Sequence, residues 1–430
     1  MSVTPVIRRS LFGTASGLSA ALAGACAPWG GCRSPAGQGV SGTVQVLSVR
    51  VGRFEKELNE VSQLFMQQYP NIKVDWRNYS GPIGDTVLAL AASGELRDIV
   101  NFGVVSTAPL AAQGALLGLN SFIRRDRYDL GDFWPWCVEG IKFKGEMYAM
   151  HVDVNTNVVF YNKALLDRAG VAAPTGDWTW NHLLDAARKL TRRADADTVF
   201  GFALRATTYY AIEPWLWQHG AAMMNKDMTR SMVDDPRSVE ALQWLADLRH
   251  VHRVWPTPEE MQQAGAQNTD QLFQSGKLAL YYQGWWLRET LLRTPPVFPY
   301  DLAEPPKGAV KKASFFHQGP FHIGKATRIP EASWAFLSWW AGKEGQREFQ
   351  RKLFQGPPAR KSLASEFAER ITRAGLAALE YSQDSSLHPE LGNIKAAFDR
   401  GLQPLWRNEQ TARVAAAEIA REQNQLLSRR

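Results

Sequence analysis

The sequence predicts an α/β protein with two lobes, in which mixed sheets are flanked by helices and the lobes are joined by a hinge of crossing strands. Three observations support this fold class. The 430 residues exceed what one simple core organises and fit two domains. Strand-like and helix-like segments alternate, which is typical of parallel or mixed sheets covered by helices. Extended stretches near residues 150 and 320 could carry the chain to the second lobe and back.

The first part of the chain alternates between strand and helix patterns. Apolar residues three and four apart, such as Leu58, Val61 and Phe65, place one buried face on a helix. Ser93–Gly94 is a helix stop signal. We expect a strand at Thr43–Val49, a helix through Leu58 and Phe65, a strand at Ile72–Trp76, a helix at Thr86–Ala92, a strand at Ile99–Phe102 and a helix at Ala108–Gln113.

The remaining chain begins with a turn at Lys144–Glu146, after which a long extended segment forms the first crossing. Asp235 and Pro236 are the preferred residues at the N-cap and first position of a helix. Later elements are the crossing strand Met147–Tyr161, helices at Asn162–Ala169 and Trp180–Leu190, the helix after Pro236, a second crossing strand at Phe315–Ile323, and helices at Pro330–Ala341 and Thr411–Leu427.

The first forty residues are typical of an export signal followed by a tether. Arg8 and Arg9 precede an apolar run that ends at Ala25 and is too short to span a bilayer, which needs about 20 residues. The arginine pair resembles a twin-arginine signal, and export by the general route stays open. Cys26 resembles a lipidated lipoprotein cysteine, with plain cleavage as the alternative. We therefore assign 1–25 to a signal peptide and 26–41 to a flexible tether.

Charge and cysteine content argue against several classes of protein. The net charge of +7 is scattered and mixed with acids, whereas a nucleic-acid-binding protein concentrates its basic residues. With Cys26 assigned to the anchor, the two remaining cysteines do not make a disulfide framework, and pairing of Cys32 with Cys137 is left open. No cluster of His, Cys and carboxylates has metal-ligand spacing. The sequence therefore predicts no metal, no cofactor and no nucleic-acid partner.

Catalytic signatures are also missing from the sequence. It contains no GxSxG, HExxH or GxxxxGK[ST] motif. A secreted glycan-active enzyme remains an alternative, because two carboxylates distant in sequence can meet in a fold. The 16 tryptophans, many in pairs, fit either a core or a cleft where flat sugar faces stack.

Six segments, in sequential order over residues 42–430, resemble the extracellular solute-binding protein family that includes the maltose-binding proteins. The segment Ala92–Ile99 looks like the family's "SGelPDi", with Arg97 where Pro is usual. The others are Gln113–Leu119 ("GlLlpL"), Gly145–Met150 ("GkiYalP"), Val158–Lys163 ("lyYNK"), Phe273–Leu280 ("F~~GkaAm") and Gly284–Trp286 ("GpW"). The resemblance implies a periplasmic-binding-protein type II-like fold.

The resemblance also implies how the chain divides between the lobes. The N-terminal lobe would take residues 42–152 and a return segment at 319–355. The C-terminal lobe would take 153–318 and the helical end, 356–430.

A set of cleft residues follows from the same resemblance. Trp286 falls on the family's stacking tryptophan, Trp285 could take that role by a one-residue shift, and one of the pair must point into the core. Arg50, if it faces the cleft, would suit an acidic or phosphorylated solute. The implied ligand-binding set is Ser48, Arg50, Phe102, Ser106, Asp153, Asn155, Tyr209, Tyr210, Trp285, Trp286, His317 and Gly319.

The implied function is solute capture without chemistry. The resemblance predicts a monomeric substrate-binding component of an ABC importer, which traps a mono- or oligosaccharide between its lobes and delivers it to membrane permease subunits. It would be periplasmic or anchored by lipid to the outer face of the cytoplasmic membrane. A binding protein for an anionic or phosphorylated polyol, and one that reports to a sensor kinase, remain alternatives.

Overall fold

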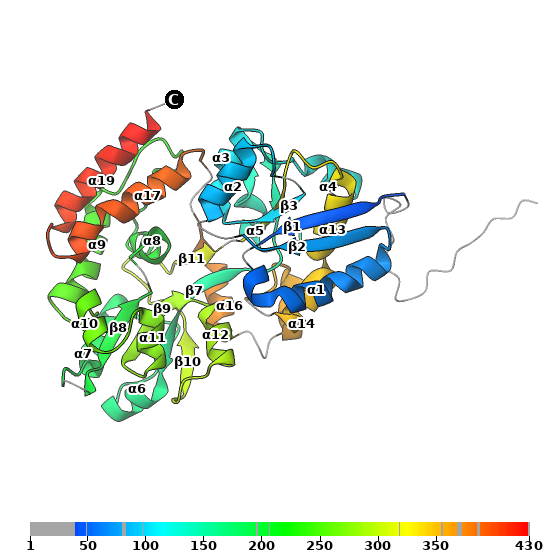
Figure 1. Ribbon diagram of the computed structural model, residues 1–430. Coiled ribbons are helices and arrows are strands. Elements are labelled where there is room, and N and C mark those ends of the chain that lie inside the picture. The colour runs from blue at the N-terminus through cyan, green and yellow to red at the C-terminus, as the bar shows by residue number, and fades with distance from the viewer. Residues whose placement is uncertain are drawn as a thin grey trace, which may run out of the picture.

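The computed structural model describes residues 39–48, 50–79, 83–96, 98–194, 197–205, 207–317, 319–353, 356–367, 372–384 and 388–428. These residues form two α/β lobes (Figure 1), one holding most of the first 150 residues and the other most of the helical C-terminal part. Cys26, Cys32 and the predicted signal and tether, apart from residues 39–41, lie outside the described residues.

The first lobe is built on a sheet whose described strands run in the order β2-β1-β3-β12-β6. Strand β1 pairs in parallel with β2 and β3, whereas β12 is antiparallel to β3 and β6. Alternation in β1 buries Val44 and Val46 on one face. The elements are β1 (Gly42–Leu47), α1 (Val51–Gln68), β2 (Ile72–Arg77), α2 (Ile83–Ala92), β3 (Ile99–Asn101), a 3-10 turn (Val104–Ser106), α3 (Thr107–Ala112), α4 (Asn120–Arg125), α5 (Pro135–Glu139), β4 (Lys142–Phe143), β5 (Glu146–Met147), β6 (Ala149–Met150), β12 (Phe321–Ile323), α13 (Pro330–Trp340), α14 (Lys343–Lys352) and α15 (Lys361–Ala364).

The second lobe is built on a sheet ordered β13-β11-β7-β9-β8, with β10 also paired to β7. Strand β9 is antiparallel to β7 and parallel to β8, so the sheet is mixed as predicted. Its elements are β7 (Asn155–Asn162), α6 (Lys163–Ala169), α7 (Trp180–Leu190), β8 (Phe200–Leu204), α8 (Tyr209–Gln218), α9 (Pro236–His250), α10 (Pro258–Gln263), α11 (Thr269–Gln274), β9 (Leu278–Gly284), α12 (Leu287–Arg293), β10 (Tyr300–Ala303), β11 (Ser314–His317), α16 (Arg373–Glu380), β13 (Ser382–Gln383), α17 (Leu391–Gly401), α18 (Gln403–Trp406) and α19 (Ala412–Leu427).

Most predicted helices are confirmed, and their caps explain where they begin. Asp235 accepts a hydrogen bond from the backbone N–H of Arg237 at 3.0 Å, and Pro236 opens α9 as expected. Thr411 caps α19 in the same manner. Helix α7 has the predicted bounds, with a reciprocal capping box between Thr179 and His182.

The two crossing strands are each broken, so both predictions of one continuous strand are wrong. Met147–Tyr161 divides into the end of β5, then β6 and β7, because residues 151–154 leave the first sheet before joining the second. There Val154 N–H donates to the Pro357 carbonyl. Phe315–Ile323 divides into β11 and β12, since Pro320 cannot donate to a ladder. The breaks allow each crossing to change sheets.

Each lobe has its own apolar core. One cluster gathers Val46, Phe65 and Trp340, and the other gathers Phe160, Trp215 and Leu245. The predicted domain boundaries stay a prediction. Ala359, assigned to the second lobe from sequence, packs in the core of the first. None of the helices in the described part of the chain is long and apolar enough to cross a membrane.

Candidate functional site

A cavity of about 230 Å³ lies between the lobes at the crossing strands. The first lobe contributes residue Arg50 and the turn Gly103–Val105, and the second contributes α8, β11 and the start of α12. Its lining residues are Arg50, Gly103, Val104, Val105, Asp153, Asn155, Tyr209, Trp286, Phe315, His317, Gly319 and Asp384.

Seven of the twelve sequence-predicted residues line this cavity, while their role in binding remains a prediction. They are Arg50, Asp153, Asn155, Tyr209, Trp286, His317 and Gly319. Val49 and Gln318, inside two predicted loops, lie outside the described residues.

Arg50 and Asp153 form an ion pair at the hinge. Arg50 Nη2 donates to Asp153 Oδ1 at 2.8 Å, and Nη1 donates to Oδ2 at 3.3 Å. The two side chains are only 11% and 4% exposed, so water screens their attraction weakly. The fork-like geometry uses both carboxylate oxygens. The arginine that could have selected an anionic solute therefore already holds a carboxylate of its own chain.

A second buried ion pair lies at the other side of the cavity. Lys395, on α17, donates to Asp384 Oδ1 at 3.1 Å, and both side chains are 2% exposed. Burial opposes the charge of Lys395, but Asp384 outweighs it and the pKa of the ammonium is raised. The Lys395 ammonium also lies 4.2 Å from the centroid of the Tyr209 ring. The negative charge of Asp384, which lines the cavity, is therefore balanced by the buried Lys395 ammonium.

His317 supplies a neutral acceptor. The amide nitrogen of Asn157 donates to the Tyr210 carbonyl and to the Tyr282 hydroxyl, which leaves its oxygen facing His317 Nε2 at 2.7 Å. That nitrogen must therefore carry the proton. Burial, with Arg205 and Lys395 nearby, lowers the pKa of His317 to about 3. The ring is thus uncharged at neutral pH, and its Nδ1 is an acceptor for a hydroxyl group.

The adjacent tryptophans point in opposite directions. Trp285 is 1% exposed in the core of the second lobe, whereas Trp286 is partly exposed at the cavity. Trp286 lies flat over Gly284, where an added Cβ would come within 2.0 Å of the indole. Its ring is perpendicular to that of His317, with centroids 4.6 Å apart. Sequence reasoning left open which of the pair faces the cleft, and the structure places Trp286 there.

The other predicted residues lie near the cavity without lining it. Phe102 is 2% exposed and stacks on His322 at 3.8 Å, which makes it a core residue. Ser48 is buried and donates to Asn101, whose amide nitrogen donates to the Gly319 carbonyl at 2.6 Å. Ser48 therefore supports the hinge.

Ser106 and Tyr210 do not line the cavity, but each directly follows, in the sequence, a residue that does. Ser106 ends the 3-10 turn whose Val104 and Val105 line the cavity. Tyr210 accepts a hydrogen bond from Arg205 Nη1 at 2.7 Å. Its ring meets His317 edge-on.

Several lining residues were missed from the sequence. The turn Gly103–Val105 follows directly after a strand of the first lobe, which is a usual position for ligand contacts in α/β folds. That signal was available. Phe315 and Asp384 carried none, because Phe315 resembles any buried strand residue and Asp384 lies in a Ser-rich loop.

The lobes are in contact on both sides of the cavity. Arg53 of α1 meets Glu289 of α12 at 3.1 Å and donates to the Thr290 hydroxyl at 3.2 Å. On the opposite side, α17 lies against the turn Val104–Ser106, and Val105 packs on the second-lobe core. The two lobes therefore touch on both sides of the cavity, and its volume is that of this arrangement.

Solved structures share this fold. An ABC substrate-binding protein of Listeria monocytogenes, in complex with cycloalternan, superposes with a TM-score of 0.81 at 23% identity, over 90% of this chain and 99% of that one. A putative binding protein of Brucella abortus is 23% identical over 277 residues, 62% of either chain. The match thus spans 62% of the length of that curated relative.

Two further comparisons concern the sequence. The mannitol-binding protein of Pseudomonas aeruginosa is 26% identical over 150 residues, which are 34% of this chain and 33% of that protein. The family model described as bacterial extracellular solute-binding protein matches residues 52–347 of the 430, which is more than half of the chain. The chain therefore belongs to the bacterial extracellular solute-binding proteins, a family of binding proteins and not of enzymes.

Proposed function

We propose that this protein captures a small neutral polyhydroxy solute, a monosaccharide or an alditol, between its lobes. The observation that carries the proposal is the charge pairing at the cavity. Arg50 is held by Asp153, and Asp384 is held by Lys395. To bind there, an anionic solute would have to displace a buried carboxylate from its partner. A neutral solute binds without that loss, so its binding free energy is more favourable.

The size of the cavity favours a single ring or a short open chain. Pockets for drug-sized ligands measure about 300–1,000 Å³. The volume here is about 230 Å³. A longer oligosaccharide, which the sequence left open, would extend beyond this volume.

The lining chemistry suits a sugar or a polyol. An indole covers the apolar C–H face of such a molecule, and Trp286 offers one. Hydroxyl groups need acceptors when they leave water, and His317 Nδ1 and the Asn155 side chain are polar groups at the wall. The name of the Pseudomonas relative, a mannitol-binding protein, supports a solute of this class.

The mechanism we propose is a hinged trap. Open and closed forms exchange, and the solute stabilises the closed form because it contacts both lobes. The closed protein, acting as a monomer, would then dock on the permease of an ABC importer. A report to a sensor kinase would use the same closure, and the permease is our preferred partner.

Membership of an extracellular family makes this an exported protein. We further propose that Cys26 anchors it by lipid, which raises its effective concentration near the permease. Mass spectrometry of the mature protein from its host tests this, and an unmodified, freely soluble product would contradict it.

The experiment that tests the solute class is thermal unfolding of residues 40–430 with three groups of ligand. They are neutral monosaccharides and alditols, acidic sugars, and phosphorylated polyols. Binding to the native state raises the Tm by an amount set by ligand concentration over Kd. We expect shifts with the neutral group alone. Shifts confined to the anionic groups would overturn the proposal.

The matched variants are Trp286→Ala and Trp136→Ala. Both tryptophans are partly buried, but Trp136 lies on α5 and does not line the cavity. Loss of the stacking face should weaken binding about thirtyfold in Trp286→Ala. Equal affinities in the two variants would remove Trp286 from the site.

A further inference from the structure

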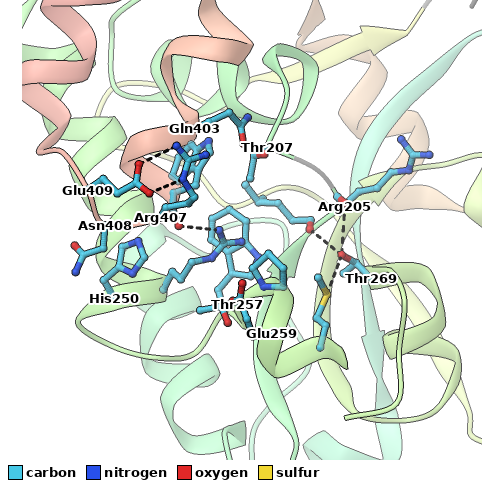
Figure 2. Close-up of a pocket in the computed structure, with 16 residues that line it drawn as sticks. Arg205, Thr207, His250, Thr257, Glu259, Thr269, Gln403, Arg407, Asn408 and Glu409 are labelled. Carbon is cyan, nitrogen blue, oxygen red and sulfur yellow. Dashed lines mark hydrogen bonds and ion pairs between the residues drawn. The ribbon is translucent and has the colours of Figure 1, made fainter. Parts of the chain in front are cut away.

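A second cavity, of about 620 Å³, lies in the second lobe (Figure 2) and is not used by the proposed function. It is formed at the carboxyl end of β8 by the end of α9, the start of α10 and the segment around α18. We call it the second-lobe pocket. Its walls are partly apolar, with Leu204, Trp255, Pro258, Met261 and Trp406.

Arg249 lines this pocket and is a buried cation whose hydrogen bonds are incomplete. The residue is 8% exposed and its guanidinium carbon lies 4.0 Å from the centroid of the Trp255 ring. Nη1 makes a long hydrogen bond to the Trp406 carbonyl at 3.4 Å. The buried Nε finds no acceptor among the described residues. Burial lowers the pKa of Arg249 to about 10, so the guanidinium stays charged at neutral pH.

The acidic side chains near Arg249 are occupied or exposed. Glu409 pairs with Arg407 through two hydrogen bonds, drawn as dashed lines in Figure 2. Glu260 is engaged by Arg193 and Arg253. Glu259 lines the pocket from the first turn of α10 and is exposed to solvent. No carboxylate of the described chain lies within ion-pair distance of Arg249, although buried arginines are normally paired.

We propose that the second-lobe pocket binds a small organic monocarboxylate with an apolar or aromatic body. A carboxylate matches the planar fork of a guanidinium, and its body would pack among the apolar walls. A dianionic phosphate fits less well, because Glu259 and Glu409 belong to the same lining and would repel the second charge. The proposal does not rest on the proposed function, because no residue of this pocket lines the cavity between the lobes.

Arg205 separates the two cavities. Its backbone carbonyl accepts from the Thr269 hydroxyl in the second-lobe pocket, at 3.5 Å. Its guanidinium points away from the other labelled residues in Figure 2 and reaches Tyr210, while lying 5.7 Å from the Trp286 ring. A ligand in the second-lobe pocket therefore lies one residue away from the wall of the cleft.

The test measures the Tm of the full mature chain with phenylacetate and benzoate, each at up to about 10 mM. The matched probes are phenylacetamide and benzamide, which keep the ring and lose the charge, and inorganic phosphate. We expect the two carboxylates to raise the Tm and the amides and phosphate to leave it unchanged. Absence of any shift with both carboxylates, or equal shifts with their amides, would overturn the proposal.

Three variants locate the site. Arg249→Gln should weaken carboxylate binding about tenfold or more, since a charged hydrogen-bond donor is lost. Glu259→Gln, at an exposed position, should strengthen binding about threefold by removing a like charge. Trp286→Ala should leave carboxylate binding unchanged.

Two results would contradict the assignment even if Arg249→Gln fails to fold. Carboxylate binding that is unchanged or weaker in Glu259→Gln would mean that the ligand does not lie beside that carboxylate. Loss of carboxylate binding in Trp286→Ala would place the ligand in the cleft.

Discussion

The cleft between the lobes and the second-lobe pocket each contain an arginine, and the two arginines differ in their partners. Arg50 in the cleft shares both of its Nη groups with Asp153. Arg249 in the second-lobe pocket has one long hydrogen bond to a carbonyl and no carboxylate in contact among the described residues. A count of charged residues would assign the same anion preference to both cavities. The ion pairing distinguishes the two cavities, because an arginine whose N–H groups already bind a carboxylate has few of them free to donate to a ligand.

The substitution with the largest expected effect on this difference removes the carboxylate partner of Arg50. Asp153→Ala leaves a buried guanidinium without its carboxylate, so we expect a loss of about 3 kcal/mol in the free energy of unfolding. The cleft should then prefer acidic sugars over neutral ones, as an unpaired arginine would. Urea unfolding and the Tm panel measure both effects.

Asp75→Ala is the matched control, because Asp75 also pairs with an arginine, Arg77, but at the surface. Its loss should stay below about 1 kcal/mol. An Asp153→Ala variant as stable as this control, and still selective for neutral solutes, would refute the account of the cleft.

A second prediction concerns the helix that carries Tyr209 into the cleft. Asp399, on α17, accepts from the Tyr209 backbone N–H at 2.6 Å. Burial raises the pKa of Asp399 to about 7. The folded state therefore holds a proton there that the unfolded chain has released, and stability falls as the pH rises from about 4 to about 7.

Asp399→Asn keeps an acceptor for Tyr209 and removes the titration. From about pH 5 to pH 8 the wild type should lose on the order of 2 kcal/mol of stability relative to this variant, allowing for the partial exposure of the carboxyl. Parallel pH profiles of Tm for the two proteins would show that Asp399 does not titrate in this range.

The smallest expected effect concerns the contact that holds the lobes closed. Arg53 is 48% exposed, so its pair with Glu289 contributes at most about 1 kcal/mol. Arg53→Ala should weaken solute binding by up to about fivefold, because the closed form loses that contact. Lys56→Ala, on the same helix and paired with Glu60 of its own lobe, should bind as the wild type does. Calorimetry at low salt decides between the two, and equal affinities would argue against a closing role for Arg53.

Helix positions and the order of elements were predictable from the sequence because they depend on local patterns. Asp235 and Thr411 cap their helices through bonds spanning two or three residues. The crossings were not predictable as they stand, since residues 147–161 read as one extended run and the break depends on which sheet each half joins. A local pattern carries no information about that choice.

The site was predicted in part for a similar reason. Arg50, Asp153 and His317 followed from the resemblance to the family, but their states did not. That Arg50 is neutralised depends on a partner 103 residues away. The neutrality of His317 depends on burial and on the orientation of the Asn157 amide. Phe102 was misplaced because it lies at the end of a strand, where one residue decides between cavity and core.

The internal cancellation of charge in the cleft also has a kinetic consequence. A binding site with a free charge attracts a charged ligand over about a Debye length, and that attraction weakens as ionic strength rises. Here Arg50 and Asp384 are each paired with an opposite charge of the same chain, and the proposed solute carries no charge, so its approach depends little on salt concentration. Uptake by an exported protein, whose medium changes its salt content, would then proceed at a rate set by diffusion and lobe closure, in dilute and saline surroundings alike.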